Sequence, residues 1–431
     1  SCYNNFNMKI AITSDIYYPM TNGVAVFAHN LANGLAARGH EVMVVCPSFT
    51  GKPSRRKDSA TGVTTVHLRS MRMPLYPDQI NKIPEKREVL GVPIPRLVYR
   101  NGIWFSLYPH PALRKVLDKF KPDVIHNQTA EGIALAAVSY ARSRDIPLVS
   151  TGHAYPDNIT GQLKLVKPIK RPVDAVLRAY MASFLKNSEY ATMPTEMAID
   201  DLVPKNRRRF NVPVEALSNG VDLQSFKPGR AKREIYKKYN LPDDCPIVLY
   251  VGRVDPEKSI KNVVQAFRLV SAKMPEVRLV VVGDGTSRAG LIELAEDLGI
   301  SDKVYFPGKI MPPDLMEIYK IGTLFATASE TETQGIVLIE AAATGLPLVA
   351  VDAGAVRELC QNRRNGVLCE PGDIEALARG MMRIIKDPEL CKRYSQGSLE
   401  IAKLHDLNRT LKRFEEIYEE AINLKQEELL D

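Results

Sequence analysis

Short apolar runs alternate with longer amphipathic segments along the whole 431-residue chain, and this alternation limits the possible folds more than any other feature. Each run has the length of a buried strand, and each longer segment has helical periodicity. Strands joined through helices form parallel sheets with right-handed crossovers. We therefore predict an α/β protein. The expected strands are 9–13, 41–46, 123–126, 147–151, 247–251, 277–282, 304–306, 323–326, 348–351 and 366–368.

The alternation restarts after residue 215, which indicates two domains, each with a doubly wound parallel sheet. A chain of this length is also too long for one ordinary hydrophobic core. We place the domains at 1–217 and 218–405, and we expect the amphipathic C-terminal segment 406–431 to pack back on the first domain. Ligands of open α/β sheets bind outside the carboxyl ends of the strands. Functional residues should therefore lie on loops that follow strands, in a cleft between the two sheets.

One part of the first domain lacks this regularity. Residues 50–110 are rich in Pro, Arg and Lys. We expect them to leave the sheet, with 75–98 forming a flexible loop. The neighbouring segments 24–38 and 132–142 have clear helical periodicity, so they are expected to be helices of the regular part.

The composition is that of an ordinary globular protein, with 45% hydrophobic and 25% charged residues. The stretch nearest to a membrane span, 336–351, carries Glu340 in its middle, so we interpret it as a buried helix and strand. Residues 1–7 have no apolar core of a signal peptide, and Met8 resembles a natural start. The six cysteines form no Cys-x-x-Cys pair, which indicates free thiols in a reducing cytoplasm and predicts no zinc site.

Positive charge is concentrated in the first half of the chain. Residues 1–210 contain 29 Lys and Arg against 16 Asp and Glu, so the rest of the chain is net acidic. The excess favours an anionic partner, although a solubilising surface is an equal alternative. Basic and apolar residues interleave over 162–186, which suits an anionic membrane surface; the alternative is a helix packed on the sheet, and Pro168 and Pro172 should break any long helix. Further basic residues are Lys52, Arg55, Arg56, Lys57, Arg207, Arg208 and Arg209.

A glycine turn with two cations follows the expected strand 247–251. Gly252 would let the backbone approach a ligand closely. Arg253 and Lys258 lie five positions apart across the turn, so both side chains can point into one site. Two cations at the end of an apolar strand suit a diphosphate. The alternative interpretation is a surface turn with salt bridges.

A second candidate site is the loop 329–335, which leads into a helix that ends at Gly345. The first N–H groups of a helix lack partners, so its N-terminus can bind an anion. Glu340 lies on this helix and could accept hydrogen bonds from a vicinal diol such as a ribose. Glu332, at the tip of the loop, could hold sugar hydroxyls. A helix cap or a surface acid is the alternative for either glutamate alone.

These motifs, in this order and spacing, closely resemble the retaining glycosyltransferases of family 4 from about residue 8 to about residue 425. The strongest matches are Glu332-x7-Glu340, the Gly252-to-Lys258 turn and Asn219-Gly220-Val221-Asp222. Further matches are Gly283-Asp284-Gly285, Asn365-Gly366, Pro371-Gly372-Asp373, Pro19 with Asn22-Gly23-Val24-Ala25, and Gly39-His40-Glu41-Val42. The resemblance implies the GT-B fold, in which two Rossmann-like domains face an interdomain cleft. It assigns acceptor binding to 1–217 and nucleotide-sugar binding to 218–405.

The resemblance also implies residue roles. Arg253 and Lys258 would neutralise the diphosphate, and Glu340 would bind the ribose. The donor sugar would be held by Glu332, by the backbone of Thr333, Gln334 and Gly335, and by His153 after the expected strand 147–151. Gly23 would approach the phosphate, Gly252 would line the turn, and Ile310 would touch the base through its backbone. The catalytic set is His153, Arg253, Lys258 and Glu332.

Two histidines follow strands in the first domain, and both have a structural alternative. His153 could merely pack under a loop, and for His126 a structural role is at least as plausible as a functional one. No Asp-x-Asp metal motif and no obvious carboxylate nucleophile occur, so we expect no metal or cofactor. A front-face route is then plausible, in which the departing phosphate takes the acceptor proton.

The segment 329–335 is similar to that of glucosyltransferases acting on diacylglycerol, whereas many family members have an aromatic residue at 334. With the basic first half, this predicts transfer of glucose from UDP-glucose to a lipid such as diacylglycerol, by a cytoplasmic enzyme peripheral on the inner face of the cell membrane. Phosphatidylinositol, a soluble sugar, a polysaccharide or a non-transferase reaction of a sugar nucleotide are alternatives. A nucleic-acid partner is not expected. An NAD-binding protein is disfavoured because no Gly-x-Gly-x-x-Gly follows the first strand.

Overall fold

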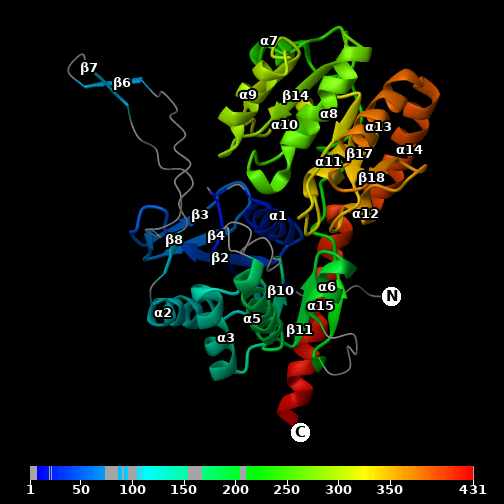
Figure 1. Ribbon diagram of the computed structural model, residues 1–431. Coiled ribbons are helices and arrows are strands. Elements are labelled where there is room, and N and C mark those ends of the chain that lie inside the picture. Colours follow the sequence, from blue (N-terminus) through cyan, green and yellow to red (C-terminus); the bar gives the residue numbers. More distant parts are fainter. Residues whose placement is uncertain are drawn as a thin grey trace. The chain divides into compact units, whose positions relative to one another are not determined.

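The computed structural model describes residues 7–18, 20, 22–72, 86–89, 92–95, 104–106, 108–153, 167–203 and 210–430 (Figure 1). Its contacts divide the chain into two compact units. The first is made of Ser1–Ala154, Arg171–Leu217 and Leu411–Asp431, and the second is formed chiefly by Ser218–Thr410. Each unit has its own sheet and its own core.

The first unit contains an eight-stranded sheet in the order β12-β11-β10-β9-β1-β2-β4-β3. All neighbouring strands are parallel except β3 and β4. The four strands predicted in this half are present, and the central β1 is buried along nearly its whole length. The bounds are β1 (Lys9–Thr13), β2 (Glu41–Pro47), β3 (Ser54–Lys57), β4 (Thr64–Leu68), β9 (Val124–Asn127), β10 (Leu148–Thr151), β11 (Tyr190–Met193) and β12 (Val214–Ala216).

The prediction that residues 50–110 leave the sheet is wrong for its first part, because β3 and β4 extend the main sheet beyond β2. All four residues of β3 are exposed, as an edge strand allows, so it lacks the apolar run by which a buried strand is recognised. The remaining described strands form two small ladders outside that sheet, which are β5 (Met71–Arg72) with β8 (Trp104–Phe105) and β6 (Lys86–Val89) with β7 (Val92–Pro95). The rest of the predicted loop 75–98 lies outside the described residues.

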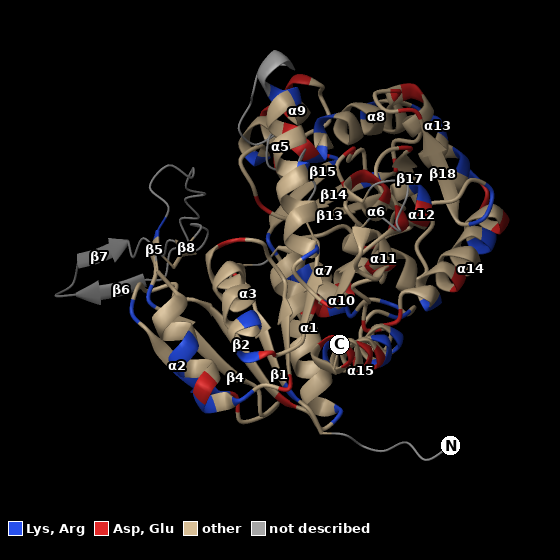
Figure 2. Ribbon diagram, turned by 90° about the horizontal axis from the view of Figure 1, so that it is seen from below, with Lys and Arg blue, Asp and Glu red and all other residues tan. Residues whose placement is uncertain are grey.

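The helices of the first unit include one that contradicts the sequence analysis. α5 (Lys167–Leu185) continues through Pro172, although the prolines were expected to break it. Pro168 is among the first four residues, whose N–H groups have no intrahelical partner, whereas Pro172 is the sixth residue and removes one backbone hydrogen bond, which the helix tolerates. The other helices are α1 (Gly23–Ala37), α2 (His110–Phe120), α3 (Gly132–Arg144) and α6 (Glu196–Leu202). Figure 2 shows charged residues on the helices of this unit, α2 among them.

The C-terminal helix α15 (Leu407–Leu430) begins in the second unit and belongs to the first from Leu411 onward. Its Phe414 and Tyr418 are fully buried in that unit. Arg413 donates to Glu215 at 2.7 Å and to Glu420 at 2.8 Å, which fixes the helix beside β12. This helix is therefore an integral part of the first core.

The second unit contains a six-stranded, wholly parallel sheet in the order β15-β14-β13-β16-β17-β18. Every strand predicted in this half is present. From β13 the chain proceeds through β14 and β15 toward one edge of the sheet, and from β16 it proceeds through β17 and β18 toward the other edge. The topological switch point of the sheet therefore lies between β13 and β16. The bounds are β13 (Ile247–Val251), β14 (Arg278–Val282), β15 (Val304–Gly308), β16 (Leu324–Ala326), β17 (Leu348–Val351) and β18 (Gly366–Cys369).

Helices cover both faces of this sheet. Val248 and Tyr250 of β13 pack in one cluster with α8, α9 and α13, whereas Leu249 packs in another with α10, α11 and α12. The predicted division of 336–351 into helix and strand is confirmed by α11 and β17, and none of the described helices meets the length and apolarity that a membrane span requires. The helices are α7 (Arg233–Lys238), α8 (Ile260–Lys273), α9 (Arg288–Asp297), α10 (Asp314–Tyr319), α11 (Ile336–Ala343), α12 (Val356–Leu359), α13 (Ile374–Lys386), α14 (Pro388–Leu404) and the short 3-10 helix η2 (Pro256–Lys258).

Candidate active site

The two loops singled out in the sequence meet at the carboxyl edge of the second sheet. One follows β13 and carries Gly252, Arg253 and Lys258, and the other follows β16 and carries Glu332. β13 and β16 are adjacent strands with opposite winding, and the carboxyl ends of such strands form the usual ligand crevice of an open sheet. The structure therefore brings the two motifs together.

Lys258 and Glu332 form a direct ion pair. The Lys258 Nζ lies 2.7 Å from the Glu332 Oε1, and each side chain is 14% exposed. Burial would raise the pKa of Glu332, but the cation and the hydrogen bond of Lys258, together with the charge of Arg253, hold that pKa below its usual value. Glu332 is therefore an ionised acceptor, which suits sugar hydroxyls.

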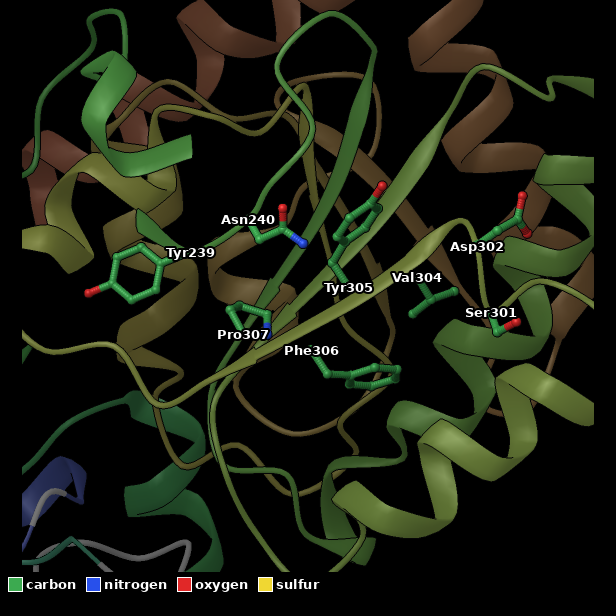
Figure 3. Close-up of a pocket in the computed structure, with 8 residues that line it drawn as sticks. All are labelled: Tyr239, Asn240, Ser301, Asp302, Val304, Tyr305, Phe306 and Pro307. Atoms are coloured by element: carbon green, nitrogen blue, oxygen red, sulfur yellow. The ribbon is translucent and has the colours of Figure 1, made fainter. Parts of the chain in front are cut away.

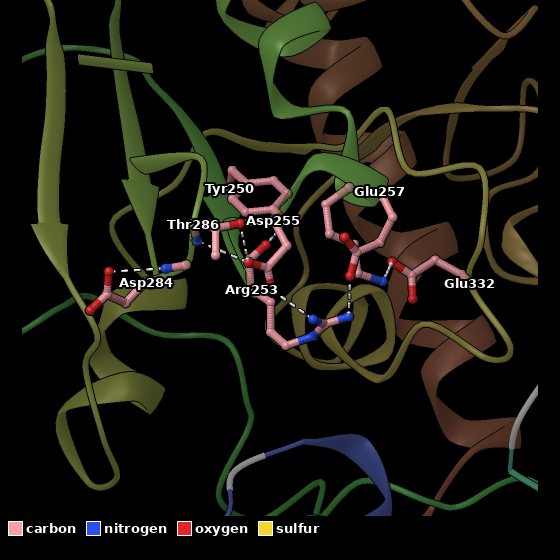
Figure 4. A network of polar contacts seen from close by, with 9 residues as sticks. Tyr250, Arg253, Asp255, Glu257, Asp284, Thr286 and Glu332 are labelled. Carbon is pink, nitrogen blue, oxygen red and sulfur yellow. Dashed lines mark hydrogen bonds and ion pairs between the residues drawn. The ribbon is translucent and has the colours of Figure 1, made fainter. Parts of the chain in front are cut away.

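Arg253 is also paired with carboxylates (Figure 4). Its Nη1 donates to the Asp255 Oδ2 and its Nη2 to the Glu257 Oε1, both at 2.6 Å. Among the described residues, the two cations thus contact three carboxylates. The sequence alternatives of a phosphate site and a turn with salt bridges are both consistent with this geometry, because a phosphate can replace a carboxylate on either cation.

Close backbone contact joins the β13 loop to the loop after β14. The Asp255 Oδ1 accepts from the Thr286 N at 2.9 Å and from its Oγ1 at 3.0 Å. Gly283 has φ +142°, and a Cβ added there would lie 1.8 Å from the carbonyl oxygen of Gly252. The Gly283-Asp284-Gly285 motif thus allows two loops to pack together.

The predicted helix after Gly335 is confirmed. α11 begins at Ile336 after Gly335 at φ +81°, and no side chain caps its N-terminus. The Gln334 side chain, 3% exposed, accepts from the Asn219 N at 3.2 Å and donates to the Ser218 Oγ at 2.6 Å. The Gln334 side chain is thus committed to the segment 218–219, and the backbone of Gln334 remains for a ligand.

Glu340 lies one turn further along α11. Its Oε2 accepts a 2.5 Å hydrogen bond from the hydroxyl of Tyr319, and burial raises its pKa to about 7. The carboxyl group therefore changes its charge near neutral pH. Ile310, by contrast, packs its side chain in the core of the unit at 5% exposure, so only its backbone can face a ligand.

The predicted residues of the first unit are Gly23 and His153. Gly23 is the first residue of α1. His153 follows β10, its Nε2 lies 2.8 Å from the Gln128 Oε1, and burial lowers its pKa to about 3, so the ring is neutral. His126 is fully buried and lies 2.7 Å from both the Tyr418 hydroxyl and the Thr151 Oγ1, which makes it a structural residue.

Asp255, Glu257 and Thr286 belong to this network but were not singled out from the sequence. Asp255 and Glu257 stand inside the Gly252-to-Lys258 motif, so their acidic character was visible as a possible source of counterions. No sequence pattern indicated a role for Thr286, because its contact with Asp255 depends on the approach of β14 to β13. Among the described residues, no cluster of three His, Cys, Asp or Glu side chains could hold a metal ion.

Two hollows of the second unit lie away from these loops. A surface cavity of about 380 Å³ runs along the edge strand β15 (Figure 3). Its lining includes no Lys or Arg, so it lacks the cations that a diphosphate needs. The residues are Tyr239, Asn240, Ser301, Asp302, Val304, Tyr305, Phe306 and Pro307.

Two family models match consecutive parts of the chain. The model described as "Glycosyltransferase Family 4" matches residues 21–225, and the one described as "Glycosyl transferases group 1" matches residues 231–400. Together they span both units and include both motif loops.

Individual relatives are similar over most of the chain. An alpha-monoglucosyldiacylglycerol synthase of Streptococcus pneumoniae is 27% identical over 84% of this chain and 75% of the relative. A GDP-mannose-dependent alpha-mannosyltransferase of Mycobacterium tuberculosis is 27% identical over 85% of each chain. Among solved structures, the sucrose-phosphate synthase of Thermosynechococcus elongatus superimposes with a TM-score of 0.72, at 22% identity, over 96% of this chain and 98% of that chain.

Proposed function

Because this chain belongs to the retaining glycosyltransferases of family 4 and has their GT-B fold, we propose that it transfers glucose from UDP-glucose to a lipid such as diacylglycerol at a membrane surface. The proposed use of a nucleotide-sugar donor rests on the ion pair between Lys258 and Glu332, which places a cation beside the proposed sugar-binding acid. The acceptor part is supported by the similarity to a diacylglycerol-glycosylating relative.

In the proposed site, the diphosphate of the donor replaces carboxylates on Arg253 and Lys258. The two cations and the free N–H groups at the start of α11 then stabilise the negative charge that develops on the leaving phosphate. Glu332 accepts hydrogen bonds from the sugar hydroxyls, and Glu340 accepts them from the ribose. His153 contributes a contact to the sugar, and the backbone of Ile310 contacts the base.

The proposed chemical step follows the front-face route. The bond between the anomeric carbon and the phosphate oxygen breaks, and the acceptor oxygen forms the new bond on the same face. The acceptor proton passes to the departing phosphate, so no additional base is required. Each cation would stabilise the transition state by a few kcal/mol, which is typical of preorganised donors.

The outer face of α5 supports the proposed membrane surface. The exposed residues of this helix recur every three or four positions and are mainly apolar, with Val176 at 68% and Tyr180 at 43% exposure. Exposed basic residues flank this face, with Arg171 in the second turn of the helix and Lys186 directly after its last residue. An exposed apolar face flanked by basic residues suits the interface of an anionic membrane. Arg207, Arg208 and Arg209 lie outside the described residues.

The test is a donor and acceptor panel with product identification by mass and NMR. UDP-glucose and GDP-mannose are each offered with diacylglycerol vesicles, phosphatidylinositol vesicles and soluble sugars. We expect glucosyl-diacylglycerol with an α linkage and released UDP. A product formed only with a soluble sugar would refute the lipid acceptor, and a product formed only from GDP-mannose would refute the donor.

A different donor is the second candidate, since a GDP-mannose-dependent relative is as similar as the glucosyltransferase. The two readings share the roles of Arg253, Lys258, Glu332 and Glu340. They differ in the base and in the sugar, which the same panel distinguishes.

Glu340 predicts a pH dependence of nucleotide binding. Its folded pKa of about 7 lies above the usual value, so the carboxylate that accepts the ribose diol forms only as the pH rises through 7. We expect the dissociation constant of UDP to fall by up to about ten-fold between pH 6 and pH 8, beyond the change seen with Glu340→Gln. Calorimetric titration at several pH values measures this. An equal pH dependence for UDP and for its 2′,3′-dideoxy analogue would contradict the ribose role.

A further inference from the structure

The charged side chains that the described residues place around the two cations do not sum to a positive site. Within the part of the chain that the structure describes, Arg253 and Lys258 form ion pairs with the carboxylates of Asp255, Glu257 and Glu332. If all five groups are ionised, the cluster has a net charge of −1. A diphosphate, itself an anion, must therefore compete with these carboxylates for the two cations.

Asp255 is held firmly in place. Its side chain is 7% exposed, and its Oδ1 accepts two hydrogen bonds from Thr286 while its Oδ2 holds Arg253. Its backbone carbonyl oxygen also accepts from the Lys258 N at 3.0 Å, which closes the turn that carries this lysine. Moving the Asp255 carboxylate would thus disrupt the β14 loop and leave a buried charge without its partners.

Glu257 is held much more loosely. Its side chain is 22% exposed, and among the described residues Arg253 is the partner with which it forms an ion pair. The Arg253 side chain is 42% exposed, and solvent screens exposed ion pairs so that they contribute little free energy. Figure 4 shows the guanidinium joined by a dashed line to each of the two carboxylates.

We propose that Glu257 is an exchangeable counterion of Arg253, which releases the guanidinium to the donor diphosphate, and that Asp255 is a positioning residue that holds this guanidinium both with and without ligand. This inference rests on the proposed donor site and deepens it. Glu257 competes with the ligand for one nitrogen of the guanidinium, whereas Asp255 orients the group toward the ligand through another.

Two simpler explanations, based on charge alone or on the integrity of the turn alone, predict different effects of neutralising these acids. If only charge mattered, neutralising either acid would strengthen the binding of an anion. If only the integrity of the turn mattered, either change would weaken it. The exchange mechanism requires opposite effects from two acids that contact the same guanidinium.

The experiment is calorimetric titration of the full chain with UDP and with GDP. We expect Glu257→Gln to lower the dissociation constant of the nucleotide diphosphate by about two- to five-fold, since a weak competing pair is removed. We expect Asp255→Asn to raise it by at least about ten-fold, because the guanidinium loses its buried anchor. The Glu257→Gln effect should shrink with UMP, which lacks the second phosphate.

Two further variants serve as controls. Glu375→Gln removes the same charge from another exposed i,i+4 pair, in which the Glu375 Oε2 lies 3.2 Å from the Arg379 Nη1, and it should leave nucleotide affinity unchanged. Thr286→Val keeps every charge but removes one hydrogen bond to Asp255. It should raise the dissociation constant by about two- to five-fold, and it tests the positioning role even if Asp255→Asn fails to fold.

The outcomes distinguish a failure of the exchange mechanism from a failure of the proposed donor site. An unchanged or weaker affinity in Glu257→Gln, or an unchanged affinity in Thr286→Val, overturns the exchange mechanism while leaving the donor site in place. If the unaltered chain binds neither UDP nor GDP, or if Lys258→Ala binds them as well as the unaltered chain does, the proposed donor site itself is refuted.

Discussion

Replacing Lys258 with alanine is expected to lower the kcat of glycosyl transfer by about 10²- to 10³-fold, as the loss of one preorganised charge donor typically does. The ammonium group lies on the turn after β13 and contacts Glu332 at 2.7 Å. Its removal deprives the leaving phosphate of a cation and leaves the Glu332 carboxylate without its main partner. Steady-state kinetics with UDP-glucose and a lipid acceptor measures the change.

The chain contains a closely matched control. Lys320 pairs with Glu317 at 2.7 Å, and both side chains are 14% exposed, as in the Lys258 pair. Lys320→Ala therefore removes an ion pair of the same length and burial outside the two motif loops. We expect it to retain activity. A kcat for Lys258→Ala within about three-fold of the Lys320→Ala value would be incompatible with the proposed role.

Replacing Gly283 with alanine is expected to destabilise the second unit by about 2–5 kcal/mol. The residue adopts φ +142°, a conformation that L side chains rarely adopt, and an added Cβ would lie 1.8 Å from the Gly252 carbonyl oxygen. The β13 and β14 loops would have to separate, which also disturbs the contact between Asp255 and Thr286. Thermal and denaturant unfolding, followed with a probe in the second unit, measures the loss.

Gly290 provides the comparison for this change. It lies in α9 without a positive φ, and a Cβ added there would meet nothing within 4 Å. Gly290→Ala should be neutral or should stabilise the protein by about 0.5–1 kcal/mol, since alanine favours a helix over glycine. Equal midpoints for the two variants would show that the β13 and β14 loops can separate without loss.

Much of the fold could be predicted because a buried parallel strand is recognisable from a short, continuous run of apolar residues. The run 247–251 is apolar throughout, and it is β13, fully buried between two layers of helices. β3 could not be recognised in this way, because its residues Ser54–Lys57 are all exposed at the edge of a sheet. Its place depends on pairing with β4, which no local pattern encodes.

The candidate site was predicted in part for a similar reason. Arg253 and Lys258 follow one strand within a few residues, so the sequence itself keeps them near each other. Glu332 stands 74 positions from Lys258, and only the adjacency of β13 and β16 brings the two into contact. The resemblance to a family supplied this pairing, whereas the physical argument from single residues did not.

The sequence by itself determined most of the buried strands, several of the helices, the glycines that permit close turns, and the types of charged residue available at the carboxyl edge of the second sheet. The tertiary structure decided which carboxylate holds which cation, that the Gln334 side chain binds Ser218, and that burial moves the pKa of Glu340 to about 7. The physical reason is that periodicity and backbone conformation are local properties, whereas ion pairs and desolvation depend on atoms brought together from distant parts of the chain.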